Sequence, residues 1–311
     1  MTTIEAPVLV VGGGITGLSS ALFLAWHGVP CVLVERHPDL LIHPRARGLT
    51  PRTVELYRQV GLEGAIQRSP YAGSDFSWAP VLAQTLNDDT YDHPDEPQED
   101  DGAGASPCSF GPIDQDKLEI LVRDEARRLG ADLRFSTELT SFEQHGVTAT
   151  VTDRGTGNES AVVASYLIAA DGVDSPVRQR LDIPTDGPGP LYSTMTAIVE
   201  ADLNPALRGR TATIAYLQRP QPYTIMMAHD QTGTRWVFGT GYDPATTRSR
   251  TLPPTAWPAW CGPRPACPTS RSRFIRRSPA PTSPSWPSRS ALRSLATTAA
   301  GECSWSATRR T

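Results

Sequence analysis

A glycine-rich turn between a strand and a helix constrains the fold of this chain more than any other feature. The turn is Gly12–Gly17 (GGGITG), the strand is the apolar run Val8–Val11, and the helical pattern after the turn ends at Gly28. A second apolar run, Cys31–Val34, is followed directly by Glu35. These lengths and periods are typical of a β-α-β unit in a buried parallel sheet, so the sequence predicts an α/β fold.

The turn also has the spacing of a dinucleotide-binding site. Gly12 permits the tight turn, Gly14 lets a pyrophosphate approach the backbone, and Gly17 allows the helix to pack closely on the sheet. The first helical turn, which starts with Ile15 and Thr16, offers unpaired N–H groups and the positive end of the helix dipole to phosphates. We therefore predict that the backbone of this turn binds a diphosphate.

Glu35 limits the choice of nucleotide. It ends the second strand about 20 residues after the glycines, where a carboxylate accepts hydrogen bonds from both ribose hydroxyls. This favours a free 2′-hydroxyl, and therefore FAD or NAD rather than NADP in this site. The motif alone does not separate FAD from NAD, and a glycine-rich turn without a ligand is the other alternative that it leaves open.

Further elements are predicted along the chain from periodicity and breaker residues. Helical patterns cover Pro51–Gly61 and Ile113–Leu129. Strand patterns occur at Asp132–Phe135, Thr140–Gln144, Val147–Thr152, Tyr166–Ala170, Thr194–Glu200, Thr211–Leu217, Thr224–Ala228 and Trp236–Gly241. The last four alternate like an antiparallel sheet, which we expect to form a second domain inserted after the first.

Two later motifs resemble those of the group A flavoprotein monooxygenases, the para-hydroxybenzoate hydroxylase-like family, and most closely its polyketide hydroxylase-like subgroup. The segment 169–178 (AADGVDSPVR) resembles the family's motif Asp-Gly-x-x-Ser-x-x-Arg, with Asp171, Gly172, Ser175 and Arg178 at its marked positions. The segment 43–55 (HPRARGLTPRTVE), which contains Arg45, resembles the stretch that follows the FAD ribose site.

The resemblance extends over about residues 5–245 and includes two positions of the third helix, Gln115 and Arg123. It selects FAD over NAD for the glycine-rich site. The cofactor-binding residues that we then predict are Gly12, Gly14, Ile15, Thr16, Gly17, Glu35, Arg36, Arg45, Gln115, Arg123, Asp171, Gly172 and Arg178. In physical terms, Asp171 follows a strand on a glycine turn, where its carboxylate can cap backbone N–H groups, and the arginines suit phosphate or flavin oxygens.

What the resemblance implies is a Rossmann-like FAD-binding domain of the GR2 type with an inserted antiparallel β-sheet substrate domain. The expected boundaries are residues 1–185 for an incomplete FAD-binding domain, 186–250 for a partial substrate domain and 251–311 for an irregular tail. The substrate is expected between the flavin and the inserted sheet, which covers about residues 191–242. Eight apolar or aromatic residues there are candidates to line it, half of which must face the sheet core instead: Tyr192, Met195, Tyr216, Tyr223, Met226, Met227, Trp236 and Phe238.

The activity that the resemblance implies is hydroxylation of an aromatic substrate, phenolic or polyketide. NAD(P)H, a transient electron donor, reduces FAD, and O₂ then forms a flavin C4a-hydroperoxide that transfers one oxygen atom. The cofactor carries this chemistry, so no catalytic protein residue is expected. The alternatives are another FAD-dependent oxidoreductase of the same fold and a non-catalytic FAD-binding remnant. A flavin halogenase is disfavoured because the sequence lacks Trp-x-Trp-x-Ile-Pro.

Composition and short sequence patterns limit the partners, metal sites and cellular location that we expect for this protein. A formal net charge of −4 gives no reason to expect nucleic acid or a membrane surface as partner. No apolar run is long enough to span a bilayer, and no signal peptide is recognisable. The five cysteines have no metal-binding spacing, so no metal site is expected. We therefore expect a cytoplasmic protein with reduced thiols, and the sequence does not indicate its oligomeric state.

The composition changes abruptly at the C-terminal end. Thr251–Thr311 holds nine Arg, no Lys, a single acidic residue (Glu302) and ten of the 29 prolines. The charge of this segment is therefore about +8, which leaves about −12 for the rest of a chain of −4. No helix or strand periodicity is recognisable in it. A disordered Pro/Arg tail is one interpretation.

A shifted reading frame is the interpretation that we favour. In such a frame, each new codon consists of the third base of one residue's codon and the first two bases of the next residue's codon. Read in this way, the codons of Ala256–Ser270 permit the sequence LARLVRAATGVPDL. In the same frame Glu302–Thr311 permits VFLVGDAAH, which resembles the second flavin segment of the family. Because Trp has a single codon, the pair Trp260-Cys261 can encode only Val and Trp257-Pro258 only Ala in that frame. We expect the shift between about residues 246 and 256, and this chain to be a poor enzyme or none.

Resequencing the gene around codons 246–256 and just past 311 tests this interpretation. We expect a single-base shift that restores a continuous frame through Gly-Asp-Ala-Ala-His, and TGA as the stop codon after Thr311. If no single-base shift restores that frame, or if the stop codon is not TGA, the tail is genuine.

Overall fold

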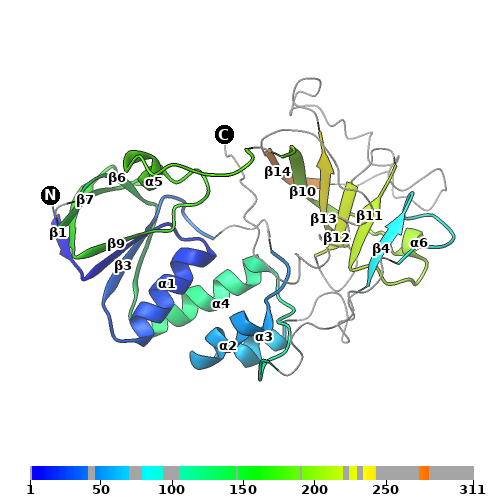
Figure 1. The fold of residues 1–311 in the computed structure, drawn as a ribbon, viewed down its shortest axis with the longest axis horizontal. Coiled ribbons are helices and arrows are strands. Elements are labelled where there is room, and N and C mark those ends of the chain that lie inside the picture. Colours follow the sequence, from blue (N-terminus) through cyan, green and yellow to red (C-terminus); the bar gives the residue numbers. More distant parts are fainter. Residues whose placement is uncertain are drawn as a thin grey trace. The chain divides into compact units, whose positions relative to one another are not determined.

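The computed structural model describes residues 2–40, 46–69, 79–93, 105–144, 146–189, 191–219, 224–229, 234–242 and 273–279. Its residues form two compact units. The first unit consists of residues 1–48, 53–66 and 113–185, and the second of residues 49–52, 67–112 and 186–311. Figure 1 shows the helices and strands of each unit.

A parallel sheet forms the centre of the first unit. Its order is β5 (Asp132–Phe135), β3 (Cys31–Glu35), β2 (Val8–Val11) and β9 (Tyr166–Ala169), and every pairing is parallel. The predicted β-α-β unit is confirmed, because α1 (Ile15–Trp26) connects β2 to β3. All four residues of β2 are buried, which explains their continuous apolar run.

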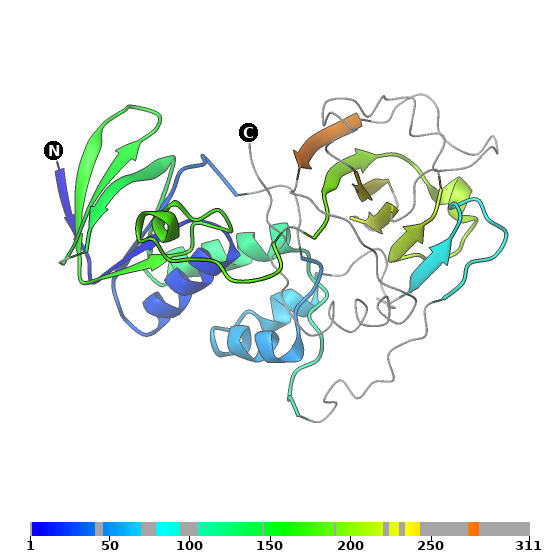
Figure 2. The same cartoon turned by 45° about the horizontal axis from the view of Figure 1, so that its top comes forward.

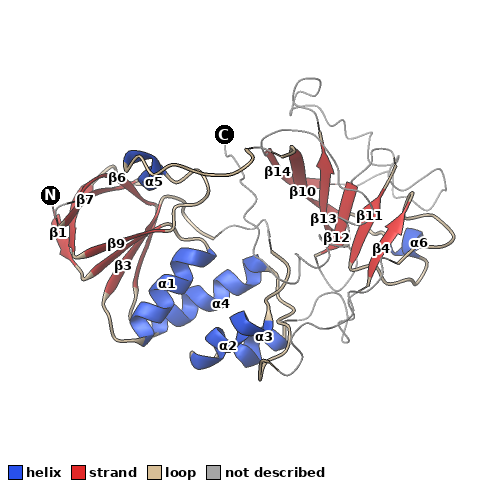
Figure 3. Cartoon of the chain, viewed as in Figure 1, coloured by secondary structure: helices blue, strands red, loops and turns tan. Residues whose placement is uncertain are grey.

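Helices cover one face of this sheet and a second sheet covers the other (Figure 3). On the helical face, α1 packs against β3 and against α4 (Gln115–Arg128), and these elements lie together in both views (Figures 1 and 2). The second sheet has the order β1 (Thr2–Glu5), β8 (Glu159–Ala164), β7 (Val147–Asp153) and β6 (Thr137–Glu143). The unit therefore has three layers. Its shorter helices are α2 (Pro51–Gln59), α3 (Glu63–Gln67) and α5 (Pro176–Arg180).

The alternation of side chains along β2 and β3 explains these layers. Leu9, Val11, Val32 and Val34 pack in one cluster with residues of the second sheet, such as Ala149. The residues between them, Val8, Val10, Cys31 and Leu33, are also buried, and the Cys31 thiol lies 3.7 Å from the Ala21 carbonyl oxygen of α1. Strands that are buried on both faces require apolar residues at every position.

The second unit is built on a six-stranded sheet. Its order is β14 (Arg273–Pro279), β10 (Thr194–Glu200), β13 (Arg235–Gly241), β12 (Thr224–Ala228), β11 (Ile214–Leu217) and β4 (Pro80–Ala83). All pairings are antiparallel except that of β11 with β4, which is parallel. Trp236, Phe238 and Met226 belong to the core cluster of this unit, together with Ala206 and Leu207 of the short helix α6 (Asn204–Leu207).

Two segments differ from the expectations of the sequence analysis. β4 lies in the range 1–185 that was expected to form the FAD-binding domain, but it pairs with β11 of the second unit. Arg273–Pro279 was expected to be irregular, yet it forms β14 and covers the edge of β10, with Thr196 opposite Ser278. The rest of the tail lies outside the described residues. No helix in the described part of the chain is long and apolar enough to cross a membrane.

Truncation of Leu33 should test the layered core of the first unit. Leu33 is fully buried in β3, so Leu33→Ala should lower the free energy of unfolding by about 2–5 kcal/mol. Ile120→Ala on α4 is the control, because that side chain is 45% exposed and its loss should change stability by no more than about 0.5 kcal/mol. Urea denaturation measures both, and equal effects would contradict the described packing.

Candidate functional site: a dinucleotide loop at the edge of the parallel sheet

The glycine-rich loop passes very close to its neighbours. Gly12 has a φ of +108°, and a Cβ atom there would lie 2.2 Å from the carbonyl oxygen of Ala170, which follows β9. A Cβ atom on Gly17 would lie 1.8 Å from the carbonyl oxygen of Gly12. The Gly12 N–H donates to the Val34 carbonyl oxygen of β3 at 2.9 Å. Gly12 and Gly17 are therefore required so that the loop, α1 and β9 can approach one another.

Gly14 differs from these two glycines. It is the N-cap residue of α1, its φ of −79° suits any residue, and a Cβ atom there would meet nothing within 4 Å. Within the described part of the chain, the N–H groups of Gly14 and Thr16 have no hydrogen-bond acceptor. Open space beside unpaired N–H groups at the start of a helix suits a phosphate group, so the loop fits the diphosphate of FAD.

Glu35 lies directly beside the loop at the carboxyl end of β3. Its Oε2 accepts from the Gly13 N–H at 2.7 Å, and its Oε1 accepts from the His37 N–H at 2.8 Å and also contacts His37 Nδ1. The neighbouring residue Arg36 is exposed. The predicted ribose acid and the predicted phosphate loop are thus adjacent, as a dinucleotide site requires.

Asp171 stabilises the turn after β9. Its Oδ1 accepts from the Ser175 hydroxyl at 2.6 Å and its Oδ2 from the Val177 N–H at 2.9 Å. Ser175 is the N-cap of α5 and accepts from the Arg178 N–H at 3.0 Å, while Gly172 has a φ of +96°. The expected capping role of this carboxylate is present in the structure. Ser175, a marked position of the family motif that was not among the predicted cofactor residues, takes part in it.

Gln115, the first residue of α4, is hydrogen-bonded to Ala46 in the segment between β3 and α2. Its N–H donates to the Ala46 carbonyl oxygen at 3.0 Å, and its side-chain oxygen accepts from the Ala46 N–H at 3.3 Å. Its side-chain nitrogen donates to Glu119 at 2.8 Å. Glu119 also accepts from the Ile15 N–H at 3.1 Å. The structure thus brings Gln115 and Ile15 together through Glu119, which was not among the predicted site residues.

Three predicted arginines, Arg123, Arg178 and Arg45, remain. Arg123 of α4 forms ion pairs with two exposed carboxylates, Asp39 at 3.3 Å and Asp124 at 2.9 Å. The Arg178 guanidinium donates to the Ile183 carbonyl oxygen at 2.9 Å. Arg45 lies outside the described residues.

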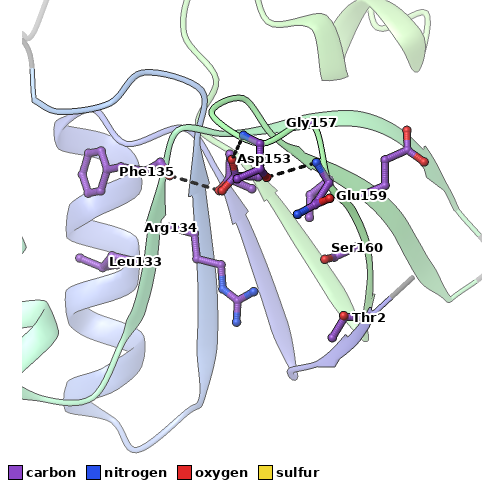
Figure 4. A pocket seen from close by; sticks show the side chains of 12 residues that line it. Thr2, Leu133, Arg134, Phe135, Asp153, Gly157, Glu159 and Ser160 are labelled. Atoms are coloured by element: carbon purple, nitrogen blue, oxygen red, sulfur yellow. Dashed lines mark hydrogen bonds between the residues drawn. The ribbon is translucent and has the colours of Figure 1, made fainter.

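A surface hollow of the first unit lies elsewhere (Figure 4). It is lined by β5, β7 and β8 and by the turn around Gly157, and none of its twelve lining residues is a predicted cofactor residue. Asp153 within it accepts from the Thr156 N–H at 2.7 Å and from the Gly155 N–H at 2.9 Å, and these bonds lower the pKa of its carboxyl group. They complete a turn between strands, so Asp153 has a structural role.

Comparison with known proteins identifies the family. Residues 5–256 match the family described as the FAD binding domain. The chain is 43% identical over 254 residues to the tetracenomycin B2 monooxygenase-dioxygenase of Streptomyces olivaceus, which covers 77% of this chain and 47% of that protein. It is 41% identical over 272 residues to the tetracenomycin A2 monooxygenase-dioxygenase of Streptomyces glaucescens, covering 79% of this chain and 48% of that protein.

Solved structures agree with this result. The crystal structure of aklavinone-11 hydroxylase with FAD and aklavinone superimposes with a TM-score of 0.77 and 31% sequence identity, over 90% of this chain and 54% of that one. The chain spans about half the length of the curated relatives that it matches. The fold class expected from the sequence and FAD as the cofactor are confirmed, and the chain belongs to the FAD binding domain family.

Proposed function

We propose that this chain is the FAD-binding part of a monooxygenase that hydroxylates an aromatic substrate, phenolic or polyketide, with NAD(P)H and O₂. One observation carries the proposal. The loop Gly12–Gly17, Glu35 and Asp171 follow or end three adjacent parallel strands, β2, β3 and β9, at the same edge of the sheet. In open α/β sheets this edge is where nucleotide cofactors bind.

Each residue has a distinct task in this proposal. The N–H groups of Gly14 and Thr16 bind the phosphates of FAD, and Glu35 accepts hydrogen bonds from its ribose. Asp171 holds the turn at which β9 ends, and Arg178, together with Arg45, contributes positive charge towards the anionic cofactor. FAD, once reduced by NAD(P)H, supplies the chemistry that activates O₂. The protein binds and orients the cofactor and excludes water.

The substrate class is proposed from the relatives. Two of them are named as tetracenomycin monooxygenase-dioxygenases, a third from Streptomyces peucetius subsp. caesius, 37% identical, is an aklavinone 12-hydroxylase, and the matching crystal structure contains aklavinone. Two further relatives, each 38% identical, are named as putative polyketide hydroxylases, whereas one that is 37% identical is named as a 4-methyl-5-nitrocatechol 5-monooxygenase. Most of these names favour a polyketide substrate, and one of them is that of a simple phenol.

The two faces of the sheet in the second unit separate the eight candidate substrate residues into two groups. Met226, Trp236 and Phe238 belong to the core cluster with α6, so these three of the eight candidates pack inwards. Tyr216 and Met227 alternate with core residues along β11 and β12 and therefore belong to the opposite face. Of the other candidates, Tyr192 is exposed and Met195 is buried, while Tyr223 lies outside the described residues.

We propose that the second unit, with residues 186–250 and the strand β4 that pairs with them, forms the substrate domain and that this opposite face contacts the ring system. Burial raises the pKa of the Tyr216 hydroxyl. The hydroxyl is therefore protonated at neutral pH, and it can donate a hydrogen bond to a phenolic or quinone oxygen.

Alanine at two of the loop glycines should separate cofactor binding from folding. Gly14→Ala adds a methyl group in open space, so the stability of the cofactor-free protein should change by less than about 0.5 kcal/mol. The same methyl group projects where the phosphates approach, so the Kd for FAD should rise about tenfold or more, equivalent to about 1.4 kcal/mol. Flavin fluorescence titration measures the Kd, and thermal unfolding measures the stability.

Gly17→Ala is the matched contrast. Its methyl group would overlap the Gly12 carbonyl oxygen, so the cofactor-free protein itself should lose about 1–3 kcal/mol of stability. A Gly14→Ala protein that binds FAD as tightly as the parent would show that the phosphates bind elsewhere.

The activity is tested by NAD(P)H oxidation with a panel of phenols and anthraquinones. We expect the protein encoded by the restored reading frame to oxidise NAD(P)H faster when a ring substrate is present and to form a hydroxylated product detectable by mass spectrometry. The 311-residue chain should bind FAD, but a ring substrate should increase its rate of NAD(P)H oxidation little or not at all. Reduction of FAD without any product across the panel would instead indicate another FAD-dependent oxidoreductase of the same fold.

A further inference from the structure

Glu119 is a buried carboxylate whose position in the first unit suggests a specific role. It lies one turn after Gln115 on α4, and only 1% of the residue is exposed. Its Oε1 accepts two hydrogen bonds, from the Ile15 N–H at 3.1 Å and from the Gln115 side-chain nitrogen at 2.8 Å. A carboxylate this deeply buried requires such partners to offset the cost of its desolvation.

These two bonds belong to a longer chain of contacts. Ile15 is the first residue of α1 and Gln115 the first of α4. The other end of the Gln115 carboxamide accepts from the Ala46 N–H at 3.3 Å. Because the amide nitrogen donates to Glu119, the amide oxygen must point to Ala46. Glu119 therefore determines the orientation of the carboxamide and links the start of α1 to the segment at Ala46.

The contact with Ile15 also determines which backbone groups are left for phosphate. The first turn of a helix has donors without acceptors in the helix. Glu119 accepts from one of them, whereas the N–H groups of Gly14 and Thr16 have no acceptor in the described part of the chain. The carboxylate is stabilised there by the positive end of the helix dipole.

We propose that Glu119 is a positioning residue for the FAD site. It holds the Ile15 N–H and the Gln115 carboxamide in fixed places, and it thereby directs phosphate to Gly14 and Thr16. This inference rests on the proposed function, because it assumes that the loop binds FAD. We assign the effect to the acceptor oxygen Oε1 of Glu119, on which both of these bonds end.

Three variants of the full chain test the proposal. Glu119→Ala removes the acceptor and should raise the Kd for FAD about tenfold or more, the effect expected when a buried donor loses its partner. Glu119→Gln retains an oxygen acceptor at the same position, so its Kd should stay within about threefold of the parent. Glu125→Ala is the control, because Glu125 lies on the same helix but pairs with the exposed Arg128, and its Kd should be unchanged.

Hydrogen exchange in the cofactor-free protein provides a second readout. The Ile15 amide should exchange about tenfold faster in Glu119→Ala than in the parent, and within about threefold of the parent in Glu119→Gln. Mass spectrometry of a peptide that covers residues 12–18 measures this.

The outcomes separate this inference from the proposed function. A parent chain that does not bind FAD contradicts the proposed function, and the exchange of Ile15 then still decides whether Glu119 holds the loop. If the parent binds FAD and Glu119→Ala binds it equally well, the positioning role is wrong. If Glu119→Gln loses as much affinity as Glu119→Ala, the charge is required and the assignment to the acceptor is overturned.

Discussion

The first unit depends on one close approach, that of the glycine-rich loop to the ends of β3 and β9. The loop can enter this space only because Gly12 and Gly17 lack side chains, and the Gly12 N–H then completes a bond to Val34. The same approach brings α1 onto the sheet at a short distance. The next residue of the loop, Gly13, then donates to Glu35 at the end of β3 at 2.7 Å, and α1 begins at Ile15.

Three carboxylates surround the loop, although its proposed ligand is an anion. Each of them accepts backbone N–H groups: Glu35 from Gly13, Glu119 from Ile15 and Asp171 from Val177. Within the loop and the first turn of α1, the N–H groups of Gly13 and Ile15 are thus bonded to the protein's own carboxylates, and those of Gly14 and Thr16 have no acceptor among the described residues. A carboxylate bonded in this way rigidifies the backbone, and a rigid set of donors binds phosphate without a further cost of ordering.

Local patterns in the sequence predicted those parts of the fold that local chemistry determines. The runs Val8–Val11 and Cys31–Val34 became β2 and β3 because strands buried on both faces must be apolar throughout. β4 and β8 were not predicted. β8 is separated from β9 by Ser165 alone, so the sequence has no turn signal between strands that belong to different sheets. β4 pairs with β11, more than a hundred residues away, and no local period encodes that partner.

The residues of the candidate site divide in the same way, into those that a local pattern predicts and those that only the packing reveals. Glycines and the terminal acid of a strand have spacings that a sequence reveals, and Asp171 was recognised through its resemblance to a family motif. Glu119 has no such signal, because at its position on α4 it reads as one more charged residue of an amphipathic helix. Its role becomes visible only when α4 is packed on α1, where the carboxylate is enclosed and the Ile15 N–H is 3.1 Å away. A buried hydrogen-bond acceptor on an otherwise amphipathic helix is therefore the feature that connects the packing of this unit to its chemistry.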